Sequence, residues 1–302
     1  MRIEQDHIVV AAIVAVLLLL ETGIRLFEND LSGNLNHINE IPDIVERYTQ
    51  DQRPKILFLG NSLINEAVDV EQLDRDLSGR YLIDKITPDA TSVWDWSMIM
   101  NNQVIPSGSN IDYVVMGFAW GLLSDQYLPN PSRLGGYFAG LDDLGLLYDY
   151  GMRKFSDYSE FLFGWISKLF VNREAVRNKV LVNAIPYYEQ FVRMENQAGR
   201  PDEAEQVVEN SKVDDQYTIL NRFLDELDKN GTKLIIIAMP IEDRYSVDAG
   251  LAALLQERAL EYLDYREFFV NTESVYKDGA HLNEKGKRIF TSALNKLFRQ
   301  ET

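Results

Sequence analysis

The chain contains no cysteine among its 302 residues. It can therefore form neither a disulfide framework nor a thiolate nucleophile or thiolate metal site. Histidine is almost as scarce, because only His7, His37 and His281 are present. Three histidines so far apart do not have the short ligand spacing of a zinc site, and we predict no bound metal.

Basic residues are also in short supply. Lys and Arg number 30 against 47 Asp and Glu, which gives a formal net charge of −17. Binding to nucleic acid needs clustered Lys and Arg to neutralise phosphates, so nucleic acid is not an expected partner. The chain has no P-loop, no dinucleotide fingerprint and no HExxH motif, and we predict no cofactor.

What the chain does have, first, is a long apolar N-terminal segment. Ile8 to Leu20 are thirteen uninterrupted apolar residues, and with the residues up to Phe27 the segment reaches membrane-spanning length. Glu21 and Arg25 are spaced i, i+4 on a helix, so they can pair where the span meets the interface. We therefore predict a transmembrane anchor over residues 1–27.

Two alternatives to this anchor remain open. The segment could be a cleaved signal peptide, although no convincing small-x-small cleavage site follows it. The chain could also be a soluble cytoplasmic protein whose N-terminal helix is buried. As an anchor, the segment has Arg2 before it, which favours a cytoplasmic N-terminus. The expected location is then the cell membrane, with a single span and the main domain extracytoplasmic, in the periplasm.

Beyond the anchor, residues 28–54 are polar and are predicted to form a stalk or linker with a short helix. The following sequence alternates short apolar runs with amphipathic segments. Strands are predicted over Lys55–Leu59, Tyr81–Ile86, Asp112–Phe118, Lys233–Met239 and Tyr262–Tyr265, and helices over Val70–Leu77, Thr91–Asn102, Asp214–Asn230, Leu251–Leu260 and Glu284–Phe298. This alternation predicts an α/β domain over residues 55–302, a three-layer parallel sheet with helices on both faces.

A long segment at about residues 126–213 separates the third predicted strand from the fourth. It is rich in Tyr, Phe and Leu, most densely over Phe161–Phe170, and is predicted to be a helical insertion. Its aromatic side chains suit a cap packed on the sheet domain. They equally suit a surface that touches lipid headgroups or a membrane partner.

If the protein uses an imidazole as a general base, His281 is the best candidate, because His7 and His37 lie at the edge of the apolar segment and just beyond it. Asp278 precedes His281 by three residues, across a turn that contains glycine, and could orient the ring and stabilise its charged form.

Ser62 follows the first predicted strand after Gly60 and Asn61. Ligands bind at the carboxyl ends of the strands in a parallel α/β sheet, so Ser62 would present its hydroxyl at that edge. A serine needs a neighbouring base to become a nucleophile. Alternatively, Ser62 only caps the helix that follows.

Taken together, the two segments resemble the SGNH/GDSL family of serine hydrolases. Gly60-Asn61-Ser62-Leu63 is similar to the first block of that family, and Asp278-Gly279-Ala280-His281-Leu282-Asn283 with Gly286 is similar to its last. The resemblance implies an SGNH, flavodoxin-like fold, with Ser62 as the nucleophile, His281 as the base and Asp278 as the residue that orients the base. No Gly-x-Ser-x-Gly motif is present, so an α/β-hydrolase elbow is not supported.

The middle blocks of the family are incomplete in this chain. The expected glycine is absent from Ala90-Thr91-Ser92, and the expected asparagine is absent from Gly117-Phe118-Ala119-Trp120-Gly121. The loss of one oxyanion donor typically costs about 2.7–4 kcal/mol of transition-state stabilisation. The candidate oxyanion or binding groups are therefore those of Ser62, Asn61, Thr91, Ser92 and Gly121.

The chain is similar to the membrane-anchored members of this family that modify cell-envelope polymers. This similarity implies a serine acyl esterase or O-acyltransferase that acts on an acylated, in particular acetylated, envelope polysaccharide or on a small acyl ester. It also implies a membrane-bound O-acyltransferase as a partner. The missing asparagine keeps a second interpretation open, an inactive scaffold or glycan-binding subunit of a polysaccharide-modifying complex. A third interpretation is a soluble cytoplasmic lipase or esterase with a buried N-terminal helix. Hydrolysis and transfer are both open at this point.

Overall fold

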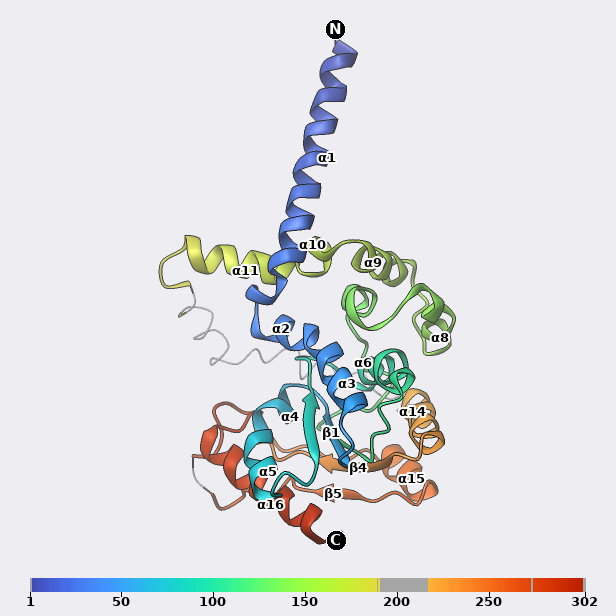
Figure 1. Cartoon of the computed structure of the whole chain (residues 1–302), viewed down its shortest axis with the longest axis vertical. Coiled ribbons are helices and arrows are strands. Elements are labelled where there is room, and N and C mark those ends of the chain that lie inside the picture. The colour runs from blue at the N-terminus through green and yellow to red at the C-terminus, as the bar shows by residue number, and fades with distance from the viewer. Residues whose placement is uncertain (1, 189, 191–216, 273, 301–302) are drawn as a thin grey trace.

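A computed structural model describes residues 2–188, 190, 217–272 and 274–300. Within these residues, five strands form one sheet in the order β2-β1-β3-β4-β5 (Figure 1). The strands are β1 Lys55–Leu59, β2 Leu82–Ile86, β3 Tyr113–Phe118, β4 Lys233–Ala238 and β5 Tyr262–Asp264. Every neighbouring pair is parallel. The predicted parallel sheet is confirmed, and each strand matches its predicted run to within one residue.

Helices cover both faces of the sheet, as predicted. On one face α4 (Ser62–Ala67) and α5 (Val70–Asp76) pack with the C-terminal helix α16 (Glu284–Gln300). The other face is covered by α6 (Val93–Ile99), α14 (Thr218–Lys229) and α15 (Ala249–Glu257). All five residues of β1 are buried, which explains why this central strand is an unbroken apolar run.

Residues 28–54 belong to the folded domain and do not form the predicted stalk. They fold into η1 (Glu28–Asp30), α2 (Gly33–Asn39) and α3 (Ile41–Gln50). The side chains of Ile41, Ile44 and Tyr48 lie on one face of α3 and are buried. The Tyr48 hydroxyl donates a hydrogen bond of 2.8 Å to the carbonyl oxygen of Ile56 in β1. The stalk was predicted because most residues of this segment are polar. The few apolar residues on one face of α3 nevertheless attach the segment to the sheet.

Helix α1 (Arg2–Phe27) projects from the domain (Figure 1). Its stretch from Asp6 onward is long and apolar enough to cross a membrane, and none of that stretch is buried within the protein. The predicted pair at its base is present, with Arg25 Nε 2.7 Å from Glu21 Oε1.

The described part of the predicted insertion is helical and lies between the sheet and the base of α1 (Figure 1). Positions 189 and 191–213 of that insertion, and the first three residues of the helix predicted from Asp214, lie outside the described residues. The segment consists of α7 (Pro131–Arg133), η4 (Leu134–Phe138), η5 (Leu141–Asp143), α8 (Leu144–Asp149), α9 (Phe155–Ile166), α10 (Lys168–Val171) and α11 (Arg173–Ala184); η2 (Met100–Val104) and η3 (Ile105–Ser107) lie before it, after α6.

Two glycines allow the helices of this segment to pack closely. A Cβ atom at Gly164 of α9 would lie 2.0 Å from the carbonyl oxygen of Ser132, and one at Gly135 would lie 2.2 Å from that of Phe161. Backbone atoms cannot move away as a flexible side chain can, so any larger residue at either position would separate α9 from α7 and η4.

Candidate active site

The turn from β1 into α4 holds Ser62 at the carboxyl edge of the sheet. The Asn61 side chain accepts a hydrogen bond from Leu63 N and donates one to the Thr91 carbonyl oxygen, each at 3.0 Å. A Cβ atom at Gly60 would lie 2.8 Å from Cγ1 of Ile64, a residue of α4. The glycine therefore lets α4 start directly against the end of β1, with Ser62 as its first residue.

His281 lies on a loop that is held at both ends. Tyr276 and Leu282 form an isolated antiparallel bridge, and Lys277 N donates a 2.9 Å hydrogen bond to the His281 carbonyl oxygen. The Asn283 side chain donates to the Ser274 carbonyl oxygen at 2.8 Å. These bonds leave the backbone around His281 little freedom.

Within this loop, the carboxylate of Asp278 faces the imidazole. Its Oδ1 and Oδ2 lie 3.0 and 3.1 Å from His281 Nδ1. Oδ1 also accepts hydrogen bonds from the backbone N–H groups of Ala280 (2.9 Å) and His281 (2.8 Å). Partial burial raises the pKa of Asp278, but these N–H donors and the neighbouring imidazole outweigh it and hold the pKa below its ordinary value. Asp278 is therefore ionised at neutral pH.

The tertiary fold brings this loop to the nucleophile candidate. His281 Nε2 lies 2.9 Å from Ser62 Oγ, although the two residues are 219 positions apart. Lys277 Nζ and Glu66 Oε1, at 3.2 Å, join the loop to α4. Because an ionised Asp278 can only accept, we place the imidazole proton on Nδ1, which leaves Nε2 free to accept from the serine hydroxyl. The site is open to water, since the side chains of His281 and Asp278 are 25% and 45% exposed.

Of the predicted oxyanion or binding groups, the Asn61 side chain and Ser92 are occupied elsewhere. The Asn61 amide binds the turn as described above. Ser92 donates its backbone N–H to Asp95 Oδ2 (3.1 Å) and its hydroxyl to the Tyr127 carbonyl oxygen (3.1 Å), so it caps α6. Gly121 lies in the turn after β3, where its carbonyl oxygen accepts from Ser124 N, while its own N–H has no acceptor among the described residues.

Thr91 differs from Asn61 and Ser92. It is fully buried beside the serine turn, with its hydroxyl 3.2 Å from the Gly60 carbonyl oxygen. Among the described residues, neither the Thr91 N–H nor the Ser62 N–H has an acceptor. A buried N–H without a partner is rare in proteins, so the Thr91 N–H, together with that of the half-buried Ser62, is suited to a ligand oxygen.

Ala90, the residue before Thr91, has a backbone conformation that is rare for alanine. Ala90 has φ of +52°, the left-handed conformation that favours glycine. The guanidinium of Arg133 donates to the carbonyl oxygens of Asp89 (2.8 Å) and Ala90 (2.6 Å), which helps to hold this conformation. The sequence contains no local signal for Arg133, because it comes from the distant helical segment.

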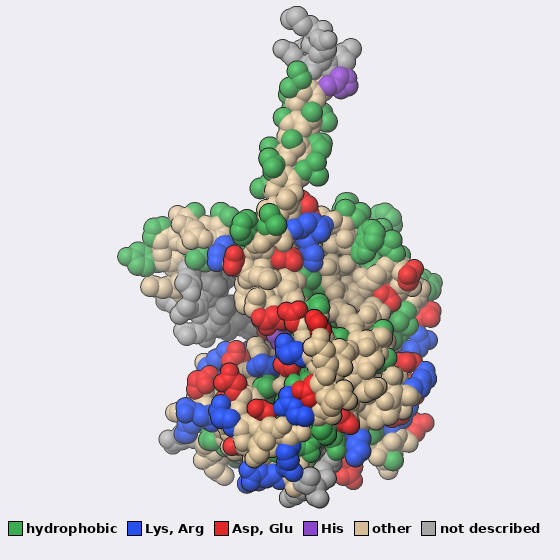
Figure 2. All heavy atoms as spheres, viewed as in Figure 1, with side chains coloured by type: hydrophobic (Ala, Val, Ile, Leu, Met, Phe, Trp, Pro, Cys, Tyr) green, Lys and Arg blue, Asp and Glu red, His purple; other side chains and the backbone are tan. Residues whose placement is uncertain are grey.

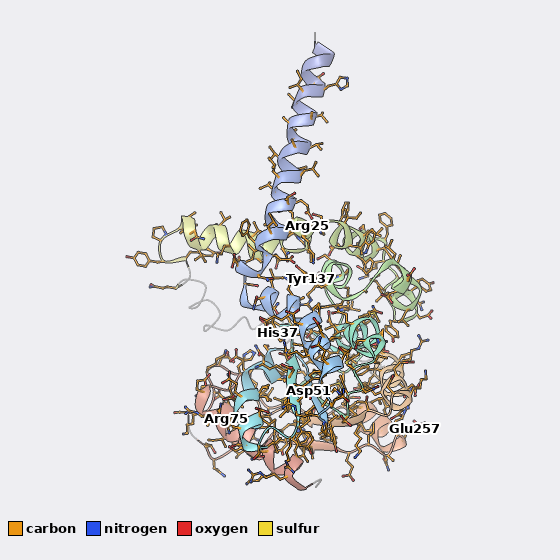
Figure 3. The ribbon with its side chains drawn as sticks, in the orientation of Figure 1. Arg25, His37, Asp51, Arg75, Tyr137 and Glu257 are labelled. Atoms are coloured by element: carbon orange, nitrogen blue, oxygen red, sulfur yellow. The ribbon has the colours of Figure 1, made fainter. Side chains whose placement is uncertain are left out.

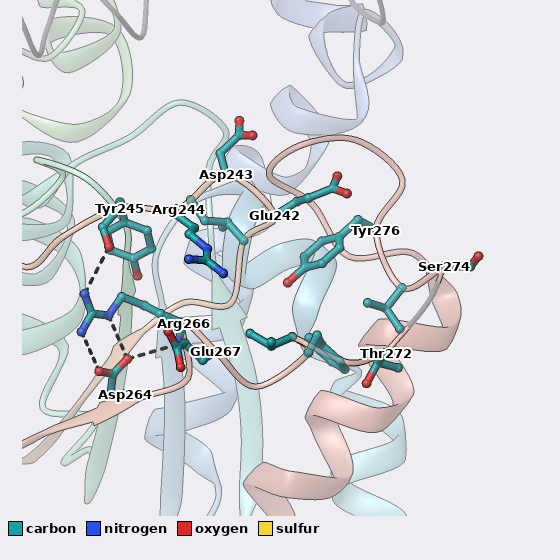
Figure 4. Close-up of a pocket in the computed structure, with 14 residues that line it drawn as sticks. Glu242, Asp243, Arg244, Tyr245, Asp264, Arg266, Glu267, Thr272, Ser274 and Tyr276 are labelled. Atoms are coloured by element: carbon teal, nitrogen blue, oxygen red, sulfur yellow. Dashed lines mark hydrogen bonds and ion pairs between the residues drawn. The ribbon is translucent and has the colours of Figure 1, made fainter.

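A cavity of about 660 Å³ opens next to the His281 loop (Figure 4). It is adjacent to that loop because Asp243 N donates to the Gly279 carbonyl oxygen at 3.1 Å. Arg266, paired with Asp264 at 2.7 Å, and Tyr245 lie on one side of it. Ser62, His281 and Asp278 are not among its lining residues, which are Ile241, Glu242, Asp243, Arg244, Tyr245, Asp264, Arg266, Glu267, Phe269, Val270, Thr272, Ser274, Val275 and Tyr276.

Comparison with known proteins finds no family model and no curated protein that matches the chain. Among solved structures, it is similar to a GDSL-like lipase from Bacteroides thetaiotaomicron, with 12% identity and a TM-score of 0.40 over 88% of this chain and 100% of the other. It is also similar to a lipase/acylhydrolase from Enterococcus faecalis, with 12% identity and a TM-score of 0.40 over 82% and 96%.

Proposed function

We propose that the protein is a serine acyl esterase or O-acyltransferase that uses Ser62, His281 and Asp278. The observation that carries this proposal is the continuous chain of contacts from Ser62 Oγ to His281 Nε2 (2.9 Å) and from His281 Nδ1 to Asp278 (3.0 Å). A serine that only capped α4 would not need an imidazole at its hydroxyl. The same contacts disfavour an inactive scaffold.

In the first half-reaction, Ser62 Oγ attacks the acyl carbonyl carbon while its proton passes to His281 Nε2. Asp278 stabilises the resulting imidazolium without taking its proton. The tetrahedral intermediate then collapses, and the leaving alcohol takes the proton from Nε2. In the second half-reaction, water or a sugar hydroxyl loses its proton to His281 and attacks the acyl carbonyl carbon of the acyl-enzyme. The bond to Ser62 Oγ then breaks, and His281 Nε2 returns the proton to Oγ, which restores Ser62 and the neutral imidazole.

The negative charge on the intermediate needs donors in place of the missing family asparagine. The N–H groups of Ser62 and Thr91 fit this role, because they flank the serine and have no acceptor among the described residues. Such fixed donors stabilise the transition state more than water does, because they need no reorientation during the reaction.

For the substrate, we propose an acylated, in particular acetylated, cell-envelope polysaccharide. The neighbouring cavity supports a polyhydroxylated ligand, since it combines carboxylates and guanidinium groups with the aromatic rings of Tyr245 and Tyr276. The apolar helix α1 supports a membrane anchor, with the domain on the extracytoplasmic side. A membrane-bound O-acyltransferase beside this anchor would supply or receive the acyl group.

The test is the hydrolysis of a chromogenic acetyl ester by the full-length protein in detergent. We expect Ser62→Ala to lower kcat by at least about 10⁴-fold and to abolish labelling by a fluorophosphonate, which reacts only with an activated serine. Ser292→Ala, an exposed serine in α16, is the matched control and should retain both activities. Equal turnover by Ser62→Ala and the wild type would remove Ser62 from the mechanism, and no labelling of the wild type would favour the scaffold.

A further inference from the structure

Helix α9 exposes apolar side chains on the outside of the protein. Phe155, Phe163 and Ile166 are 88%, 56% and 61% exposed, and Leu162 and Trp165 are exposed next to them. Inward-facing Phe161 is fully buried. A helix on the surface of a water-soluble domain normally has one apolar stripe, directed to the core. Helix α9 has a second one, directed away from it.

The neighbouring helix continues this surface. In and just after α11, Val180, Val182 and Ile185 are exposed. Figure 2 shows hydrophobic side chains on both sides of the base of α1, at the end of the domain from which α1 projects. We call this surface, made of Phe155, Leu162, Phe163, Trp165 and Ile166 of α9 with Val180, Val182 and Ile185, the apolar platform. Large exposed apolar patches of this kind mark contacts with membranes or proteins.

Hydrogen bonds hold the platform at a defined level along α1. Glu21 accepts from the backbone N–H groups of Lys168 (2.8 Å) and Leu169 (3.0 Å). Arg25, which is labelled at this junction in Figure 3, donates to the Ile166 carbonyl oxygen at 3.0 Å. The uninterrupted apolar run of α1 ends at Leu20, immediately before Glu21. The junction of α9 and α10 therefore lies where the apolar span ends.

Below this junction, a further set of contacts fixes the same helices. The Tyr137 hydroxyl donates to Asn172 Oδ1 at 2.9 Å, and Lys168 Nζ lies 3.5 Å from the centre of the Tyr137 ring. Lys168 Nζ is also 3.8 Å from Glu28 Oε2, just after α1. Because these residues connect η1, directly after α1, with η4 and α10, the platform cannot move away from the base of the anchor without breaking these contacts.

The positive net charge of the region around the platform favours an anionic lipid surface as its partner. Residues 153–184 contain six Lys or Arg and three Asp or Glu, whereas the whole chain has a net charge of −17. Exposed basic residues next to apolar and aromatic side chains are typical of segments that lie in the headgroup region of anionic membranes. Tryptophan is enriched at the same depth, which suits the exposed Trp165.

We propose that the apolar platform lies in the interface of an anionic lipid bilayer, in the leaflet where α1 leaves the membrane. The proposal rests on the membrane anchoring of α1 and adds a second, peripheral contact to it. The domain is then held against the membrane in one orientation and does not swing on a single helix.

Spin labels can test this in the full-length chain, because the absence of cysteine allows single labelling sites. The variants Phe163→Cys and Val182→Cys report on the platform. Val14→Cys in α1 and Glu257→Cys at the exposed end of α15 are controls for lipid and water. Each labelled protein is reconstituted into vesicles of phosphatidylcholine and phosphatidylglycerol, and collisions with oxygen and with a water-soluble nickel complex are measured. We expect the ratio of oxygen to nickel collisions at 163 and 182 to be several-fold higher than at 257 and to approach that at 14.

Each other result overturns the proposal in a recognisable way. If the labels at positions 163 and 182 give the same collision ratio as the label at position 257, while the label at position 14 reports lipid, the platform faces water and only the anchor is supported. If the label at position 14 also reports water, both the membrane anchor and the platform are contradicted. The esterase assay of Ser62→Ala does not depend on this result. If both platform labels are shielded from both reagents, a protein covers this face. Quenching of the native Trp165 by brominated lipid, lost in Trp165→Phe, checks the result without a label.

Discussion

Replacing Asp278 by asparagine tests how His281 is oriented, with little change in shape. The asparagine oxygen can still accept the backbone N–H groups of Ala280 and His281, which Oδ1 of Asp278 accepts at 2.9 and 2.8 Å. The amide nitrogen would replace Oδ2, which lies 3.1 Å from His281 Nδ1. This nitrogen donates where the carboxylate accepts, so it favours the tautomer whose proton is on Nε2. That tautomer cannot accept the proton of Ser62.

The size of the loss follows from how exposed the carboxylate is. A fully buried aspartate in such a triad accounts for about 10⁴-fold in kcat. The Asp278 side chain is 45% exposed, so water screens its charge and can partly replace it. We therefore expect Asp278→Asn to lower kcat by about 10²–10³-fold, which corresponds to about 2.7–4.1 kcal/mol of transition-state stabilisation.

The assay measures kcat and KM with a chromogenic acetyl ester, together with the rate of fluorophosphonate labelling. Both kcat and the labelling rate should fall while KM stays nearly constant, because Asp278 acts through the imidazole. Asp43→Asn, which changes an exposed aspartate in the first turn of α3, is the matched control. A folded Asp278→Asn protein with wild-type kcat would refute the assignment of Asp278 as the residue that orients His281.

Three further predictions concern stability. Ala90→Gly should raise the free energy of unfolding by about 0.5–1 kcal/mol. It removes about 1–2 kcal/mol of left-handed strain at φ +52°, and the greater entropy of glycine in the unfolded chain offsets part of this gain. A lower Tm of the variant would contradict this prediction. Tyr48→Phe should destabilise the protein by about 0.5–1.5 kcal/mol in urea unfolding, because it removes the 2.8 Å bond to Ile56, whereas a free stalk predicts no change. Because folding lowers the pKa of Asp278, its carboxylate stabilises the fold fully above its unfolded pKa of about 3.9, and this stabilisation is lost as the pH falls through the lower folded value. The difference in Tm between the wild type and Asp278→Asn should therefore shrink from pH 7 to pH 3, and a constant difference would count against this linkage.

The features that could be predicted from the sequence are those encoded by neighbouring residues. The run Ile56–Leu59 is apolar at every position because β1 is covered on both faces, so its burial could be predicted from composition alone. The relation between Asp278 and His281 is also local, since a turn of three residues places the carboxylate against the ring. The prediction of a stalk was wrong because the buried side of α3 contains few residues, and the polar residues between them dominate the composition of the segment.

The pairing of Ser62 with His281 could be expected only from a resemblance, because 219 positions separate them and no local pattern sets a distance between them. The oxyanion donors could be predicted from the sequence even less well than this pairing. Ser92 is occupied by the cap of α6, whereas the Thr91 N–H has no acceptor among the described residues. Which of two adjacent amides is free depends on helix capping and on the Arg133 contacts, and neither can be inferred from residue type.

Hydrophobic periodicity and turn residues act over a few positions, so neighbouring residues were enough to predict the strands, the apolar N-terminal helix and the two short segments that contain Ser62 and His281. The folded structure was needed to show that these segments meet at 2.9 Å, that residues 28–54 pack on the sheet and that α9 turns apolar side chains outward beside α1. Burial and long-range contact depend on which distant parts of the chain lie opposite each side chain, and a local pattern does not contain that information.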